Sequence, residues 1–401
     1  MNSAAYLEKK HTKHVQPQHM QTGGLMERIA YIGIDVHKDT NTACLFARME
    51  HEVLLQDIGT VPAGCEYMAK AIRKALKSYG LMDWDVLCGY EAGPTGYGLC
   101  KGLQKAGFKC EVMAPSTIRK ASGERTKTDR RDARMLALAL STDSYHAVHI
   151  LDDKDIATRE FTRTRNARKG DLKRAKQHLQ SFLLRMGRTY PEGGSHWTDR
   201  HWRWLGSLSF DDAYLDYSFR SYMQDIKDLE HKISMMDDMI EDIASKDGRY
   251  RDRVAKLKCF TGVETHTALS IVCEIGDFDR FPDAKSFSSY IGLVPGQDSS
   301  GKRQRYTEMT KTGNARVRTL LVEAAKGIKR ASPFNKSKRL VQRQSGQDPD
   351  VIAYADRCRR RLKLRMKRLE ESSGKNANVA TAAAARELAC FVWGMMTGNI
   401  A

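Results

Sequence analysis

Two aspartates stand at the start of a stretch with helical periodicity, where their side chains could do chemistry. The stretch runs from 127 to 140, and Asp129 and Asp132 lie in its first turn. Residues three apart lie on one side of a helix, and carboxylates are stabilised near its positive end. Two carboxylates that point the same way can hold a divalent cation if further carboxylates join them. An isolated Asp-x-x-Asp is more often an N-cap followed by a solvated aspartate, so the other ligands decide the interpretation.

Two further acids stand at strand ends in the region before this helix. Asp35 ends a short apolar strand predicted over 28–35, and Glu91 directly follows another strand predicted over 86–90. Other strands are predicted over 41–48, 52–58 and 108–113, and helices over 62–79, 97–106, 116–122 and 127–140. Three strands of a meander followed by strand–helix units is the order of an RNase H-like α/β fold.

The topology of such a sheet brings the four acids together. Its first and fourth strands are neighbours, so Asp35 and Glu91 meet near the centre, and the late helix places Asp129 and Asp132 beside them. Four carboxylates would bind one or two Mg²⁺ ions, which can activate or position a phosphodiester. Taken alone, each acid is more simply interpreted as a residue at a strand end or helix end that faces water. Their combination predicts a metal-binding, catalytic tetrad.

The net charge indicates the partner. The 401 residues include 67 Lys and Arg against 49 Asp and Glu, which gives a formal charge of +18. This excess predicts salt-sensitive binding to a polyanion, most simply a nucleic acid. We expect no stretch long and apolar enough to span a bilayer and no signal peptide before the fold, and therefore a cytoplasmic, nucleoid-associated protein without a membrane partner. Nine cysteines without a Cys-x-x-Cys pair predict reduced thiols.

Beyond residue 152 the sequence predicts long helices. One heptad-like seam comprises Tyr222, Ile226, Leu229, Ile233, Met236, Ile240 and Ile243. It follows a first helical run through an insertion over 190–217 that carries Trp197, Trp202 and Trp204. We expect two helices with coiled-coil character, paired either with each other or with a second subunit. The tryptophans are predicted to pack at the tip of this hairpin.

The last third of the chain is predicted to be mostly helical and basic. A glycine turn within 257–263 resembles a helix-hairpin-helix, whose backbone amides would face a phosphate. Ser299 and Ser300 precede Gly301 in a predicted loop, and basic groups that follow them could hold a phosphate. A run over 357–368 carries eight Lys and Arg in twelve residues and is predicted to face nucleic acid. The predicted nucleic-acid contacts are Lys127, Arg130, Arg303, Arg305, Lys311, Asn314 and Arg316.

Several short motifs, in this order and at these spacings, resemble the DEDD transposases of the insertion-sequence one-ten family. They are Tyr-Ile-Gly-Ile-Asp-Val-His-Lys (31–38), Tyr-Glu-Ala-Gly-Pro-Thr-Gly-Tyr (90–97), Thr-Lys-Thr-Asp-Arg-Arg-Asp-Ala (126–133), Thr-Gly-Val (261–263), Glu-Ile-Gly-Asp-Phe-Asp-Arg-Phe (274–281), Tyr-Ile-Gly-Leu-Val-Pro (290–295), Ser-Ser-Gly (299–301) and Thr-Lys-Thr-Gly-Asn (310–314). Each motif is short, and the series covers nearly all of the chain from residue 28 onward.

The resemblance implies a division of the chain. It predicts a RuvC-like, RNase H-fold domain over 27–151, a helical coiled-coil linker over 152–250 and a helical transposase domain over 251–401. Residues 1–26 are polar and without periodicity, which predicts a disordered tail. The resemblance also implies that Asp35, Glu91, Asp129 and Asp132 are the family's acidic tetrad, which binds Mg²⁺.

The resemblance further implies the chemistry and the partners. The family's nucleophilic serine, five residues after a proline and directly before a glycine, falls on Ser300, with Ser299 as the second choice. Attack on a DNA phosphate would form a phosphoserine and free a 3′-hydroxyl. The implied partners are donor and target DNA, a structured noncoding guide RNA and further copies of the chain in a dimer or tetramer.

Three features depart from the family pattern. They are the N-terminal extension, Thr-Gly-Val-Glu in place of Gly-Ile-Gly at the hairpin, and a long tryptophan-rich insertion. Two other functions stay open at this point. One is a metal-dependent nuclease or junction resolvase in which water attacks, and the other is a nucleic-acid-binding protein with a decayed site.

Overall fold

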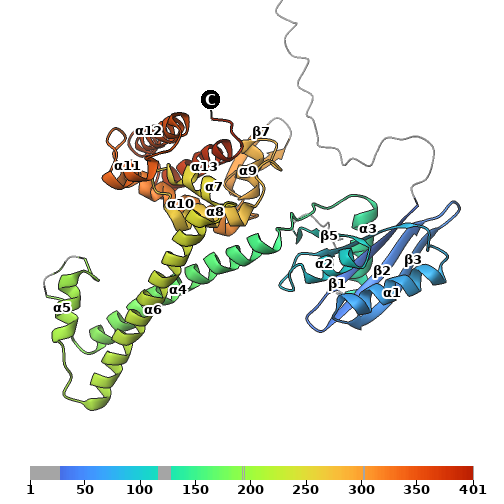
Figure 1. Cartoon of the computed structure of the whole chain (residues 1–401), viewed down its shortest axis with the longest axis horizontal. Coiled ribbons are helices and arrows are strands. Elements are labelled where there is room, and N and C mark those ends of the chain that lie inside the picture. The colour runs from blue at the N-terminus through green and yellow to red at the C-terminus, as the bar shows by residue number, and fades with distance from the viewer. Residues whose placement is uncertain (1–27, 116–127, 192, 194, 301–302, 401) are drawn as a thin grey trace, which may run out of the picture. The chain divides into compact units, whose positions relative to one another are not determined.

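The computed structural model describes residues 28–115, 128–191, 193, 195–300 and 303–400, without the side chains of 299–306. The predicted tail 1–26, the predicted helix 116–122 and Lys127 lie outside this description. The chain divides into unit 1, Met1–Ile150, and unit 2, Leu151–Ala401 (Figure 1). A further division of unit 2 near residue 250 stays a prediction.

Unit 1 is a five-stranded sheet with helices on both faces. The strand order is β3-β2-β1-β4-β5, with β1 antiparallel to β2 and parallel to β4. The strands are β1 Ile29–Val36, β2 Thr40–Arg48, β3 Val53–Pro62, β4 Asp85–Glu91 and β5 Lys109–Met113, and the helices are α1 Cys65–Ser78, α2 Gly98–Lys105 and α3 Asp129–Ser141. The predicted element order is confirmed, and the first and fourth strands are neighbours as expected.

Alternation along β1 assigns its residues to the two faces. Ala30, Ile32 and Ile34 are buried in one core with α1 and α2. The residues between them face α3, since Tyr31 packs against the small cluster that contains Leu136 and Leu140 of that helix. Asp35 continues this second set, so it emerges on the face that α3 covers.

Unit 2 begins with two long paired helices that form an arm (Figure 1). They are α4 Asp153–Arg185 and α6 Ala213–Lys246, and the short helix α5 Asp199–Ser207 lies at the tip. Ile226, Ile233 and Ile240 of the predicted seam are buried. The seam therefore serves the pairing of α6 within the chain, and the tryptophans pack at the tip in one cluster with Leu179 and Phe182 of α4, as predicted.

The body of unit 2 is a helical assembly around one core, with one hairpin of strands. Its elements are α7 Arg251–Lys258, α8 Thr265–Ile275, α9 Ala284–Tyr290, β6 Pro295–Ser300, β7 Arg303–Met309, α10 Ala315–Arg330, α11 Lys338–Gln344, α12 Pro349–Glu371 and α13 Ala377–Met396. The hairpin of β6 and β7 replaces the loop expected around Ser299 and Ser300. Its sequence has few apolar residues and carries no alternation of apolar residues that would predict strands.

One expectation for unit 2 needs correction. By length and composition α13 is apolar enough to cross a membrane, contrary to the sequence-based expectation, but half of its most apolar stretch is buried. Its buried residues belong to the core of unit 2. The glycine turn after α7 packs against α10, because a Cβ at Gly262 would lie 2.3 Å from the carbonyl oxygen of Ala324. The predicted contact of this turn with a phosphate stays a prediction.

Candidate functional site

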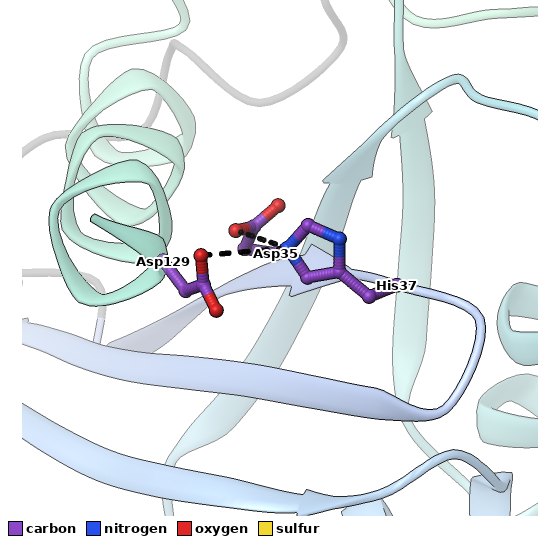
Figure 2. Close-up of side chains that lie close together, drawn as sticks. All are labelled: Asp35, His37 and Asp129. Atoms are coloured by element: carbon purple, nitrogen blue, oxygen red, sulfur yellow. Dashed lines mark hydrogen bonds and ion pairs between the residues drawn. The ribbon is translucent and has the colours of Figure 1, made fainter. Parts of the chain in front are cut away.

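Three polar side chains converge at one end of the sheet in unit 1. Figure 2 shows Asp35 from β1, His37 just beyond that strand, and Asp129 from the first turn of α3. His37 Nε2 lies 3.1 Å from Asp35 Oδ2 and 3.6 Å from Asp129 Oδ1. One ligand atom from each of the three residues lies within 4.8 Å of the others. Among the described residues this is the group of acids and histidines with spacing suited to a metal ion.

Direct contact between backbones sets this arrangement. A Cβ at Gly33 would lie 2.2 Å from both Ala133 O and Ala137 N of α3, so only glycine lets the helix rest on the strand here. Asp129 stands one turn before Ala133 on the same stripe of the helix, and Asp35 stands two residues after Gly33 on the same face of the strand. The contact between Gly33 and α3 therefore brings Asp129 close to Asp35.

An ion pair fixes α3 from its other side. Arg134 donates from Nε and Nη2 to the two carboxylate oxygens of Asp57 on β3, both at 2.8 Å. A bidentate pair of this kind constrains orientation as well as distance. The first turn of α3 is thus held over β1 while the helix is tied to the neighbouring antiparallel strands.

The electrostatics of the cluster favour a cation. Burial raises the pKa of Asp35, the His37 contact opposes this shift, and the charges of Asp132 and Asp129 add to it. The side chain of Asp35 is 19% exposed, whereas that of Asp129 is 57% exposed. Carboxylates that disfavour each other's charge beside open solvent are suited to a hard divalent cation such as Mg²⁺. The donor set of two carboxylates and one imidazole also fits Mn²⁺.

Asp132 and Glu91 lie near the cluster of Asp35, His37 and Asp129 but are not part of it. Asp132 acts on the charge of Asp35 but does not belong to the group within 4.8 Å. Glu91 ends β4 directly after Tyr90, which pairs with Ile34, so its backbone lies beside that of Asp35. By alternation Glu91 shares the face of Leu87, which packs on the α3 cluster. Its side chain does not reach the group either, and its role as a ligand stays a prediction.

His37 is the functional candidate that sequence reasoning missed. It lies inside the motif over 31–38, and its position two residues after Asp35 was the available signal, because residues two apart along a strand share a face. The imidazole is 47% exposed and contacts both carboxylates. It can orient Asp35 through the hydrogen bond or serve as a ligand itself.

The predicted nucleophile lies in unit 2, on the β6–β7 hairpin. Ser300 ends β6 opposite Arg303 of β7, and Asp298 stands opposite Arg305. The side chains of Ser299, Ser300, Arg303 and Arg305 lie outside the described part of the structure. The roles of Ser300 as nucleophile and of Arg303 and Arg305 as nucleic-acid contacts therefore stay predictions.

The base of this hairpin is firmly attached to the helical body. Thr310 N donates to Val294 O at 3.0 Å, and Asn314 N donates to Tyr290 O at 3.1 Å. Arg318 Nη1 donates to Ile291 O at 2.8 Å and to Thr312 O at 3.0 Å. The loops before β6 and after β7 are thereby held together, and the strands between them extend from a fixed base.

Both polar atoms of the Asn314 side chain form hydrogen bonds within unit 2. Its Oδ1 accepts from the amides of Arg316 and Val317 and so caps α10. Its Nδ2 donates to Glu274 Oε2 at 3.2 Å, and Glu274, whose side chain is 3% exposed, also accepts two hydrogen bonds from Arg163 of α4. This geometry gives Asn314 a structural role, and its predicted contact with nucleic acid stays a prediction.

The other predicted contacts differ in exposure. Arg130, Lys311 and Arg316 are exposed, which a nucleic-acid contact requires. The basic run over 357–368 is largely engaged within unit 2. Arg359 is buried, and Arg361 and Arg365 both pair with Glu387 of α13. The run is therefore in good part a structural feature of the α12–α13 packing.

Comparisons with known proteins identify the family of this chain. Residues 32–187 match the family model of the DEDD transposase domain of the IS110 group, described as "Transposase", and residues 254–342 match the model described as "Transposase IS116/IS110/IS902 family". A putative transposase y4qE of Sinorhizobium fredii is 34% identical over 369 residues, which cover 91% of this chain and 88% of that protein. The transposase for insertion sequence element IS1533 of Leptospira borgpetersenii is 31% identical over 358 residues, or 87% of this chain and 99% of that protein. Two family models and two relatives that span nearly the whole chain lead to one conclusion: this chain belongs to the IS110 family and is an insertion-sequence transposase.

Proposed function

We propose that the chain cuts and rejoins DNA by transesterification, with Ser300 as nucleophile and the acids of unit 1 as the metal-binding site. The observation that carries the proposal is the convergence of Asp35 and Asp129, predicted from the sequence as ligands, on one end of an α/β sheet. The fold of unit 1 is proposed to be RNase H-like, and Glu91 and Asp132 are proposed to complete the tetrad.

In this proposal the Ser300 hydroxyl attacks a DNA phosphate, the serine–phosphate ester forms, and the bond to the 3′-oxygen breaks. The leaving 3′-oxygen takes the proton that the Ser300 hydroxyl gives up. The resulting 3′-hydroxyl later attacks the phosphoserine phosphate of the joining strand, which breaks the serine–phosphate bond and returns the proton to Ser300. Bound Mg²⁺ would supply stabilisation of the negative charge that develops on the phosphate. His37 would hold Asp35 in position, and Arg303 and Arg305 would bind the phosphate.

The proposed partners follow the resemblance and the charge. Donor and target DNA are the substrates, a structured noncoding RNA guides the choice of site, and the chain acts as a dimer or tetramer. The formal charge of +18 supports a polyanionic partner but does not distinguish DNA from RNA. The hairpin with Ser300 and the acidic site lie in different units, so the reaction requires the two to meet on one phosphate, within a subunit or between subunits.

Trapping of the covalent intermediate tests the nucleophile. The wild-type chain, incubated with its element ends, guide RNA and Mg²⁺, should yield a protein–DNA adduct that survives denaturation, and Ser300→Ala should abolish it. Ser299→Ala is the matched control and should retain the adduct. Cleavage that persists in Ser300→Ala without any adduct would instead identify a nuclease that uses water.

Metal binding is tested without catalysis. Mg²⁺ or Mn²⁺ at a hundredfold excess over Kd should stabilise the wild-type chain by about 2.7 kcal/mol. Asp35→Asn and Asp129→Asn should lose this stabilisation in thermal unfolding, whereas Asp153→Asn in unit 2 should keep it. Equal stabilisation of all variants would remove the acidic cluster from the proposal.

A further inference from the structure

An exposed aromatic ring stands in a stretch of unit 2 that contains no acids. Phe334 lies between α10 and α11 and is 74% exposed, the one phenylalanine among the described residues in the exposed class. Residues 324–347 contain seven Lys and Arg and no Asp or Glu. Such a ring would gain free energy by burial, so its exposure calls for an explanation.

The loop that carries the ring is held from inside. Arg359 of α12 is 3% exposed, and its Nη1 donates to Ser332 O at 2.8 Å and to Asn335 O at 2.9 Å. Ser332 Oγ accepts from the amides of Phe334 at 3.2 Å and Asn335 at 3.1 Å. The backbone is fixed on both sides of Phe334, so the ring is presented to solvent by a rigid support.

The charge around the ring is positive and uncompensated in part. Lys336 is paired with Asp356 at 2.5 Å. Arg330, Lys338 and Arg339 are exposed. Arg339 interacts electrostatically with Glu264, whereas Arg330 and Lys338 form no ion pair among the described residues. A protein partner would be favoured by a broad apolar patch, but Val341 is the one other large apolar side chain exposed in this stretch. Charge complementarity therefore favours a polyanion with an apolar, planar component.

We propose that Phe334 is a stacking platform for an unpaired nucleobase, with Arg330, Lys338 and Arg339 binding the flanking phosphates. Bases have π-faces that stack on aromatic rings, and those within a duplex are already stacked on each other. The ligand is thus a single-stranded or looped-out nucleotide, supplied by RNA or by melted DNA. The proposal depends on the proposed function only in that the partner is a nucleic acid.

The test measures binding by the full chain carrying Ser300→Ala, so its result does not depend on any chemical step. The probes are a fluorescent single-stranded RNA, a DNA of the same sequence, and the corresponding DNA duplex. Phe334→Leu keeps an apolar side chain but removes the aromatic face, and it should weaken binding of at least one single-stranded probe about tenfold. Phe334→Trp should restore binding, and Val341→Ala should leave it unchanged. The probe that is affected identifies RNA, DNA or both as the source of the base.

Salt titration separates the ring from the cations. Phe334→Leu should lower affinity by the same factor at every salt concentration, whereas Lys338→Ala and Arg339→Ala should each reduce the slope of log affinity against log salt by about one. The proposal is overturned if Phe334→Leu binds all probes like the parent chain, or loses duplex and single-strand binding equally. It is also overturned if the variant changes the oligomeric state in sedimentation while binding stays intact.

Discussion

At the scale of single residues, His266 on α8 shows how burial and charge act together in unit 2. Burial lowers the pKa of His266 to about 4, and the neighbouring cations Arg165 and Lys169 contribute, while Asp237 opposes them. Nε2 lies 3.4 Å from the Ser270 hydroxyl oxygen. The imidazole is therefore neutral at physiological pH and is accommodated only in that state.

This histidine makes stability depend on pH in the acid range. Its folded-state pKa lies below the ordinary value of 6.5, so its contribution is complete above pH 6.5 and is lost as the pH falls towards 4. The loss amounts to roughly 3 kcal/mol, because one pKa unit corresponds to about 1.4 kcal/mol. His266→Gln cannot gain the charge and should lose less stability than the wild type between pH 7 and pH 4.5 in urea unfolding. The exposed His231→Gln should follow the wild type, and identical profiles for all three chains would contradict the prediction.

The sequence predicted individual site residues unevenly. Asp35 and Asp129 were predictable because a strand end and a helix start can be located from periodicity, and topology brings them together. His37 was missed because its two-residue spacing from Asp35 is a weak signal by itself, and its contact with Asp129 exists only once α3 is in place. The predicted nucleic-acid contact of the run over 357–368 stays a prediction, because part of its charge is used within unit 2. Charge counts do not reveal that Arg359 donates inward to the loop at 332–335.

At the scale of elements, the contact between β1 and α3 predicts how a methyl group added at Gly33 changes stability and metal binding. Gly33→Ala would place a Cβ 2.2 Å from two backbone atoms of α3, so the helix must move. We expect a loss of about 1–3 kcal/mol in unfolding free energy and weaker binding of Mg²⁺, because Asp129 moves with the helix. Urea unfolding and calorimetric titration measure the two effects.

A matched glycine provides the control for this variant. A Cβ at Gly98, in α2, would meet nothing within 4 Å. Gly98→Ala should therefore leave metal binding unchanged and stability unchanged or slightly raised. If Gly33→Ala behaves like Gly98→Ala, the helix is not positioned by this contact.

The ion pair between α4 and α8 predicts a second effect at this scale. Arg163 donates from Nε and Nη2 to the carboxylate of Glu274 at 2.7 and 2.9 Å, and the Glu274 side chain is 3% exposed. Glu274→Gln leaves a half-buried guanidinium with the Glu160 contact alone, and should cost about 3 kcal/mol. The surface pair of Glu323 and Lys326 gives the comparison, and Glu323→Gln should cost less than about 1 kcal/mol. Similar unfolding free energies for the two variants would show that burial adds nothing to the first pair.

Elements were predictable where the apolar pattern is strong. Strands of unit 1 and helices α4 and α6 have clear periods, so their existence and order were predicted correctly. The β6–β7 hairpin was not, because PGQDSS and RQRYTEM have few apolar residues and the strands are stabilised by backbone pairing. The attachment of its base through Arg318 and Asn314 is likewise a tertiary feature without local signal.

At the scale of the whole molecule, the charge of +18 predicts strong dependence of nucleic-acid binding on salt. Each phosphate contact contributes a slope of about −0.9 to log affinity against log salt for duplex DNA. Contacts to about six phosphates would lower affinity about a thousandfold between 50 and 200 mM salt. Fluorescence anisotropy with a labelled duplex measures the slope. A flat titration would indicate that the positive charge serves mainly internal pairs such as those of Arg361 and Arg365.

The fit between β1 and α3 also bears on how this transposase can change its sequence over time. Where a helix rests on a strand through interlocking side chains, replacing one of them alters the separation of the two elements by a fraction of an ångström. Here the main chains of β1 and α3 are in contact at Gly33, so no side chain at this point sets the separation of the strand and the helix. The distance between the carboxylates of Asp35 and Asp129 therefore depends little on the size of the side chains in the surrounding core. We expect substitutions in the surrounding core to change the spacing of β1 and α3 less than a substitution at Gly33 does.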